Sequence, residues 1–152
     1  MKSADDIQVV TFRVGPQEFA LDISQVERIL RYEKPAALPK APDFLEGVVR
    51  YGGGAIPVVD LRKRLELDAT IGEETRLMVL NLDGQRVGML VDQVREVMRV
   101  DSTTIAAPPP IVRGLAATYI AGLITEGERA VVLLNALRLL SSTERQALQA
   151  AV

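Results

Sequence analysis

Short runs of alternating apolar and polar residues, broken by turn residues, recur along most of the chain. From Ile7 to Val14, the side chains of Val10, Phe12 and Val14 fall on one face of an extended strand, because successive strand residues point to opposite faces. Gly15-Pro16 then marks a turn into a return strand. This pattern predicts β structure with short helices rather than a helical protein.

The segment from Ser24 to Arg31 has a different spacing. Val26, Ile29 and Leu30 follow the i, i+3, i+4 pattern of a helix, and Ser24 is a suitable N-cap. We therefore expect a short helix here, whose apolar stripe faces either the core or a partner.

Turn residues delimit the other expected elements. Prolines 35, 39 and 42 predict an extended surface connector, because proline cannot continue a helix or a central strand. Ser141 and Glu144 have the spacing of a capping box and predict a short C-terminal helix that carries Leu148. The remaining expectations are strands over 47–51, 55–60, 76–83, 86–91, 94–100, 119–125 and 130–134, one helical turn over 61–65, a hairpin turn at Asp83-Gly84 and a surface loop at 108–110.

The two halves of the chain repeat each other. Residues 10–31 match residues 78–99 at a constant offset of 68, and residues 47–65 match residues 122–140 at an offset of 75. Any two hairpins show some likeness, so a chance match is the alternative to a duplication. Turns, charges and apolar positions coincide without gaps, which favours two similar β barrels. They should share an interface, because a half of about 70 residues has little core of its own.

Composition and charge restrict the function. The chain is 48% hydrophobic and 25% charged, as in ordinary globular proteins. A net charge of −2 gives no general attraction to nucleic acid or anionic lipid. The acidic start at residues 1–6 lacks the apolar segment of a signal peptide, and no uncharged run is long enough to span a bilayer. We expect a cytoplasmic protein.

Candidate catalytic chemistry is sparse. The chain contains neither histidine nor cysteine, which removes most nucleophilic and metal sites. Asp60, Asp92 and Glu96 are the best-placed carboxylates, but the first two lie at strand ends where such groups cap turns. The lysines lack the apolar surroundings that depress a lysine pKa. We expect no catalytic residue, no cofactor and no metal, and a carboxylate-based enzyme is the least favoured alternative.

Two short motifs have simple structural interpretations. Gly52-Gly53-Gly54 is not followed by the Gly-Lys-Ser/Thr of a phosphate-binding loop, so it predicts a tight hairpin turn. Arg62-Lys63-Arg64 is followed by acidic residues and has no interleaved aromatics, so it predicts a solvated face rather than a nucleic-acid site.

Several segments, in order and at consistent spacing, resemble the CheW family over about residues 7–148. They are residues 18–29, 38–42, 47–49, 56–62, 87–94 and 119–123. The resemblance implies an all-β fold of two five-stranded SH3-like barrels sharing a hydrophobic core. Residues 1–6 would form a flexible N-terminus and residues 149–152 a C-terminal tail.

The resemblance also implies a non-enzymatic scaffold in a chemosensory array. Such a scaffold binds the cytoplasmic tip of chemoreceptors in a groove between the barrels, and it binds the regulatory domain of a CheA-type histidine kinase by barrel-to-barrel contact. Nucleic acid is not an expected partner, and membrane contact would be indirect, through receptors. The expected partner-binding residues are Val26, Ile29, Leu30, Gly47, Arg50, Tyr51, Gly52, Gly53, Val91 and Val94.

One position departs from the family pattern. The family commonly has an arginine in the hairpin that precedes the Ile-Pro strand, and this arginine falls on Gly52. Arg50 lies two residues earlier and would share its face in a regular strand. The alternative function is therefore an adaptor of a specialised, non-flagellar chemosensory pathway with altered receptor contacts.

Overall fold

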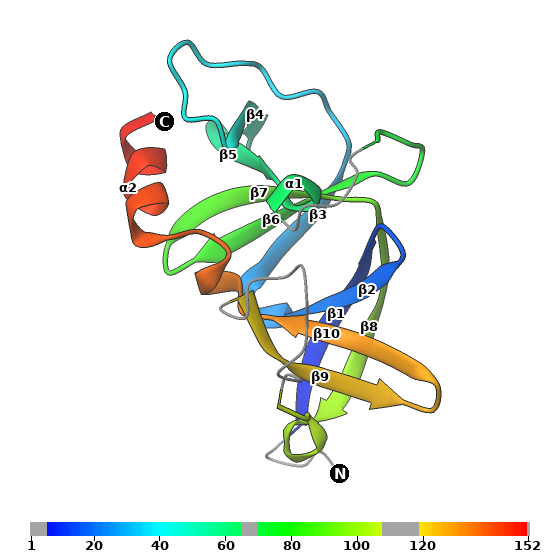
Figure 1. The fold of residues 1–152 in the computed structure, drawn as a ribbon. Helices are drawn as coiled ribbons and strands as arrows, with labels where there is room; N and C mark the ends of the chain where they lie inside the picture. The colour runs from blue at the N-terminus through cyan, green and yellow to red at the C-terminus, as the bar shows by residue number, and fades with distance from the viewer. Residues whose placement is uncertain (1–5, 65–69, 108–118, 152) are drawn as a thin grey trace.

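Two five-stranded β-sheets make up the body of the protein, as the computed structural model shows (Figure 1). The structure describes residues 6–64, 70–107 and 119–151, with side chains as far as residue 147. The first sheet has the order β8(Gln93–Asp101), β1(Asp6–Val14), β2(Gln17–Asp22), β10(Arg129–Leu134), β9(Ile120–Glu126). The second has the order β3(Val26–Arg31), β6(Arg76–Leu82), β7(Gln85–Val91), β5(Gly54–Asp60), β4(Leu45–Tyr51). The predicted fold class is confirmed.

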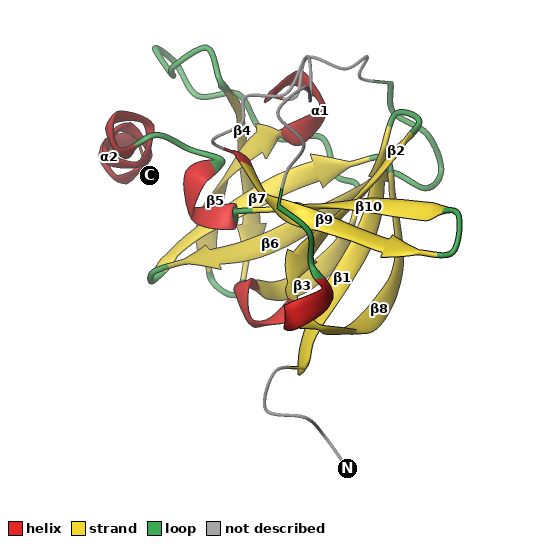
Figure 2. Ribbon diagram, turned by 60° about the horizontal axis from the view of Figure 1, so that its bottom comes forward, coloured by secondary structure: helices red, strands yellow, loops and turns green. Residues whose placement is uncertain are grey.

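Short helices connect these strands, as the view coloured by secondary structure shows (Figure 2). In the described part of the chain they are η1(Ile23–Gln25), α1(Leu61–Arg64), η2(Ser102–Thr104), η4(Ala136–Arg138) and α2(Ser142–Ala151). The capping box is confirmed, because Ser141 Oγ accepts from Glu144 N at 3.1 Å and Glu144 Oε1 accepts from Ser141 N at 2.9 Å. Leu65, the proline loop at 108–110 and the side chain of Leu148 lie outside the description.

The sequence repeat appears in the sheets, but the halves exchange strands. Strands β1 to β5 of the first half correspond to β6 to β10 of the second. Each half gives its first two strands to one sheet and its last three to the other. The parallel pairs β2/β10 and β5/β7 join the halves within each sheet. Neither half therefore completes a sheet alone.

Three apolar clusters fill the structure. The largest, which we call the shared core, lies between the sheets and contains the ring pair Phe12 and Phe19, whose centroids are 6.0 Å apart. Each sheet also has a smaller core of its own on its other face, as strand alternation requires. The six residues predicted to be buried are all buried, namely Val10, Phe12, Val58, Leu80, Val131 and Leu133.

The helix predicted from Ser24 to Arg31 is wrong. Val26–Arg31 is strand β3, which pairs with β6, and the pairing shifts between Val26 and Arg28. Such a β-bulge adds one residue to the strand, so its apolar spacing becomes three and imitates a helix. The preceding turn, η1, is capped by Asp22, whose Oδ1 accepts from Ser24 N at 2.9 Å.

Candidate partner-binding surface

Strand β3 is an edge strand of the second sheet and carries three of the expected partner-binding residues. Ile29 is 41% exposed, an unusual environment for a large apolar side chain. Val26 packs partly against the shared core, and Leu30 packs against the core of the second sheet. Ile29 is therefore the member of this apolar group that a partner can reach most easily.

The β4–β5 hairpin supplies a second group of expected residues. Arg50 is exposed, and Tyr51 packs against the same core as Leu30. Gly52 and Gly53 form the turn with φ of 59° and 80°. Strand β4 ends at Tyr51, so residue 52 lies in the turn and not on the strand face of Arg50. The expectation that Arg50 and residue 52 share a face is wrong.

A chain of contacts links the two groups. The Arg86 guanidinium lies 5.7 Å from the Tyr51 ring centroid, and its Nε donates to Glu27 Oε1 at 3.1 Å. These side chains come from β7, β4 and β3. At such exposed positions each contact contributes about 0.5–1 kcal/mol. The outer strands β3 and β4 are thus connected across β7. Leu30 and Tyr51 face the same core, whereas Ile29 pairs with Met78 and points to the other face of the sheet.

Two of the expected partner-binding residues are not free for a partner. Val91 is fully buried in the shared core. Gly47 is buried against the chain's own connector, where an added Cβ would lie 2.4 Å from Ala36 O. Ala36 and Val48 bond each other there through reciprocal backbone hydrogen bonds of 2.8 and 2.9 Å. The absence of a side chain at Gly47 therefore lets the chain's own connector, rather than a partner, approach β4 closely. Val94 is partly buried against the shared core.

The basic run at residues 62–64 is only in part the solvated face that the sequence predicts, because Lys63 is exposed and Arg62 is buried. Arg62 is 1% exposed. Its guanidinium donates to both oxygens of Asp60 at 2.9 Å and to Asp92 Oδ1 at 3.1 Å. The hydrogen bonds with Asp60 hold the pKa of Arg62 above its ordinary value. A buried guanidinium needs such partners, because an unpaired buried charge is strongly destabilising.

The same network answers the carboxylate hypothesis. Asp60 and Asp92 do converge, but on a guanidinium, and both also cap backbone groups. Asp60 Oδ1 accepts from Arg62 N at 3.0 Å, and Asp92 Oδ2 accepts from Gly15 N at 2.7 Å. Glu96 pairs with Arg129 on the first sheet instead. Capping and ion pairing thus account for all three acids.

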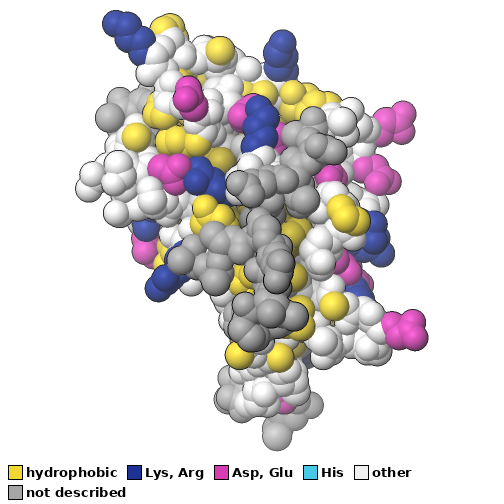
Figure 3. Space-filling view, in the orientation of Figure 1, with side chains coloured by type: hydrophobic (Ala, Val, Ile, Leu, Met, Phe, Trp, Pro, Cys, Tyr) yellow, Lys and Arg dark blue, Asp and Glu magenta, His cyan; other side chains and the backbone are white. Residues whose placement is uncertain are grey.

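Several other charged side chains are paired at the surface. Lys63 Nζ donates to Glu46 at 2.9 and 3.1 Å, which raises the pKa of Lys63, so the amine of this lysine is not activated as a nucleophile. Glu18 accepts from Arg129 Nε at 2.8 Å, and these contacts lower the pKa of Glu18. Figure 3 shows basic and acidic side chains interspersed over the visible face. Partner recognition must therefore use local features rather than a single-sign field.

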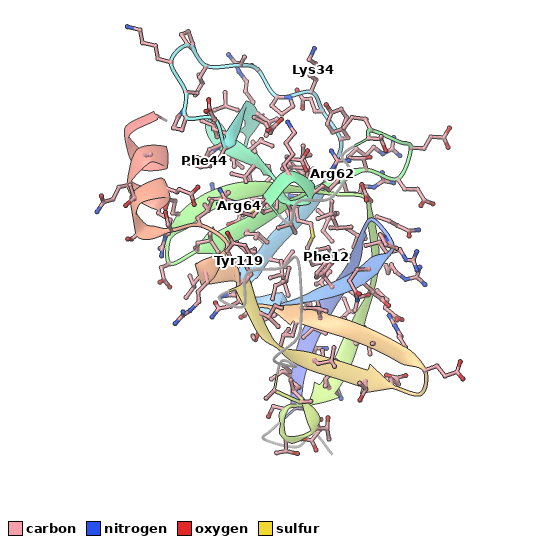
Figure 4. All side chains as sticks on the ribbon, viewed as in Figure 1. Phe12, Lys34, Phe44, Arg62, Arg64 and Tyr119 are labelled. Carbon is pink, nitrogen blue, oxygen red and sulfur yellow. The ribbon has the colours of Figure 1, made fainter. Side chains whose placement is uncertain are left out.

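Sequence reasoning missed a cluster beside α2. Figure 4 shows Phe44, Arg64 and Tyr119 along this flank of the molecule. The Arg64 guanidinium lies 5.6 Å from the Phe44 ring centroid, and its Nη2 donates to Glu144 Oε2 at 2.7 Å. The repeat contained a signal, because Tyr119 falls on Phe44 at the offset of 75.

Metal-binding groups and membrane-spanning helices are both absent from the part of the chain that the structure describes. Within the described ranges no group of three acidic, histidine or cysteine side chains is placed to hold a metal ion. No helix in those ranges is long and apolar enough to cross a bilayer.

Comparison with known sequences agrees with the fold. The profile of the CheW-like domain family matches residues 8–144. The chain is 30% identical to the chemotaxis protein CheW of Treponema pallidum, across 95% of this chain and 88% of that protein. It is 33% identical to the chemotaxis protein CheW of Klebsiella aerogenes, across 90% and 83%. It is 32% identical to protein FrzA of Myxococcus xanthus, across 90% and 86%.

A solved structure gives the same answer. The crystal structure of the scaffolding protein TtCheW from Thermoanaerobacter tengcongensis matches with a TM-score of 0.81 and 26% sequence identity, covering 91% of this chain and 90% of that one. Taken with the two intertwined sheets and the sequence matches, this shows that the chain belongs to the CheW-like domain family of non-enzymatic chemotaxis scaffold proteins.

Proposed function

We propose that this protein couples chemoreceptors to a CheA-type histidine kinase in the cytoplasm, where receptor binding recruits it to membrane-bound arrays. The observation that carries the proposal is the CheW-like fold over nearly the whole chain. Asp60, Asp92, Glu96 and Lys63 supply capping and ion pairs rather than a catalytic site, which suits a scaffold.

The receptor tip would bind along the outer strands of the second sheet. Ile29 offers exposed apolar area on β3, and the Gly52-Gly53 turn of the β4–β5 hairpin has open space around both glycines. An exposed apolar side chain and an open turn each allow the close contact on which hot spots depend. Arg50 is the cation on this hairpin nearest in sequence to the position of the family arginine. The kinase regulatory domain would bind by contact between barrels.

A specialised pathway is the second candidate, and Gly52 favours it. An arginine at this position would have to adopt φ near 59°, which side chains rarely do. The turn conformation therefore disfavours an arginine at residue 52. Either Arg50 reaches the same partner group, or the cognate receptor differs.

A binding titration separates these possibilities. Wild type, Arg50→Ala and the double variant Arg50→Ala/Gly52→Arg are titrated with the cognate receptor tip. If Arg50 substitutes for the family residue, Arg50→Ala should lower affinity about ten-fold, the scale of a charge-assisted contact. The double variant should recover part of that loss, provided circular dichroism shows an intact fold. Equal affinities for all three would remove arginine from the interface. No binding by folded wild type would contradict the coupling function itself.

A further inference from the structure

A pocket of about 710 Å³ is lined by residues of η4 and α2, and a smaller pocket of about 370 Å³ shares the Arg64–Glu144 ion pair with it. Both pockets are lined by Arg64, Tyr119 and Glu144. The smaller pocket also contains Phe44 and Lys63, and the larger one also contains Arg138. An aromatic ring and a cation therefore line each pocket.

The sequence repeat relates the two pockets. At the offset of 75, Phe44 corresponds to Tyr119 and Lys63 to Arg138. The residue corresponding to Glu46 is Ala121. Glu46 and Ala121 both lie where the strand pairing shifts register. Glu46 lies between Leu45 and Gly47, and Ala121 lies between Ile120 and Gly122. The register shift that places the Glu46 carboxylate near Lys63 is thus repeated in the second half, but alanine replaces the glutamate there.

Arg138 consequently lacks the counter-ion that its equivalent has. Lys63 bonds both oxygens of Glu46. Among the residues that the structure describes, Arg138 forms no ion pair and its side chain is exposed. Glu144 is already committed to Arg64 and to the capping box. With Arg64 and Arg145 also lining it, the pocket has more positive than negative charge, in a chain whose net charge is −2.

We propose that this pocket binds the carboxylate of an acidic side chain on a partner polypeptide, with Arg138 as its main ligand. Arginine suits this task because its planar guanidinium matches a carboxylate in geometry. Leu137 and Leu140 give the pocket an apolar part, so the acidic residue should be flanked by apolar ones. The site lies on a different element from β3 and the β4–β5 hairpin, and it is independent of the receptor contact proposed above.

The test uses the full chain and a defined peptide, acetyl-Ala-Leu-Glu-Glu-Leu-Ala-amide, with the Glu-to-Gln peptide as control. Binding is followed by NMR through the Arg138 Nε–Hε signal and the backbone amides of η4 and α2. We expect the glutamate peptide, and not the glutamine peptide, to shift these signals. Equal shifts with both peptides, or none at millimolar concentration, would overturn the proposal.

Two variants and a control sharpen the test. Arg138→Gln should weaken binding about ten-fold or more, the scale of a lost charge-assisted hydrogen bond. Ala121→Glu keeps Arg138 but supplies the counter-ion of the other half, and it should weaken binding to a similar extent. Arg99→Gln removes an exposed charge from β8 and should leave the affinity unchanged. Unaltered binding in folded Arg138→Gln, or equal loss in all three, would contradict the assignment.

Discussion

The two halves of the chain end their fifth strands in the same way but with different chemistry. After β5, Asp60 caps α1 and binds the buried Arg62. After β10, Asn135 makes no side-chain cap to η4, and Leu137 occupies the position of Arg62. Both turns hold the same place in their sheets. Backbone path and apolar positions have persisted through the repeat, whereas the polar residues have diverged.

This difference affects how the sheets are joined. Asp92 accepts from Arg62 of the second-sheet side and from Gly15 in the β1–β2 turn of the first sheet. Arg62 also donates to Thr70 O, before β6. The residue that corresponds to Asp92 is Ser24, an exposed residue that bonds locally to Asp22. The two sheets are therefore joined near Arg62 by charged hydrogen bonds, whereas at the equivalent place near Leu137 they are joined by apolar contacts.

The largest expected effect comes from breaking the Arg62 network. Arg62→Leu leaves the buried Asp60 carboxylate without its ion-pair partner and should lower the free energy of unfolding by about 3–5 kcal/mol. The triple variant Asp60→Asn/Arg62→Leu/Asp92→Ser installs the residues of the other half and should regain most of that loss. Urea denaturation measures both. A triple variant as unstable as Arg62→Leu would show that the residues of the second half cannot replace the charged network of the first half.

The connector glycines provide the next comparison. Gly47→Ala would push a Cβ to 2.4 Å from the backbone oxygen of Ala36 at a φ of 146°. Gly122→Ala would meet Ile105 Cγ2, a side-chain atom, at the same distance and Ala106 O at 3.1 Å, but at a φ that is not in the positive range. We expect a loss of about 2–3 kcal/mol for Gly47→Ala and about 1 kcal/mol for Gly122→Ala. Equal melting temperatures for the two variants would contradict this order.

Exposed apolar residues on the edge strands test the partner surface. Ile29 and Val97 correspond at the offset of 68 and are 41% and 52% exposed. Ile29→Glu should weaken receptor-tip binding about ten-fold, while Val97→Glu should change it less than about two-fold. Isothermal titration of both folded variants decides. Equal losses would extend the receptor site to the first sheet.

The smallest effect concerns acid stability of the first sheet. Hydrogen bonds from Arg129 lower the pKa of Glu18 below its ordinary value of 4.5, so this group stabilises the fold above that pH and loses the contribution as pH falls through the lowered value. Arg129→Gln should flatten the loss of unfolding free energy between about pH 5 and pH 3, and Arg99→Gln should not. Between about pH 6 and 8 stability should be constant, because no histidine titrates. An identical acid slope in wild type and Arg129→Gln would remove this role of Glu18.

Much of the fold follows from the sequence, because alternation and turn residues act locally. The hairpin at Asp83-Gly84 adopts positive φ at both residues, as its composition predicts. Strand β3 was hidden because its bulge changes the apolar period. The exchange of strands could not be predicted, since a repeat identifies equivalent segments but not their partners in the sheet.

The site was less predictable for the same reason. Arg62 appeared solvated because one of its two carboxylates, Asp92, lies 30 residues away in the chain. Val91 and Gly47 looked available because burial by a distant connector or sheet leaves no local signal. Leu30 and Tyr51 face the same core only because β3 and β4 are the two edges of one sheet, which their separation in the sequence does not reveal.

The coupling function itself is tested most directly by assembling the three components. Purified chain is mixed with the cognate receptor tip and the regulatory domain of the cognate kinase, and complexes are measured by sedimentation velocity. Separate binding surfaces predict a ternary complex, with kinase-domain affinity changed less than about three-fold by saturating receptor tip. Displacement of one partner by the other, or failure of either to bind the folded chain, would contradict the account.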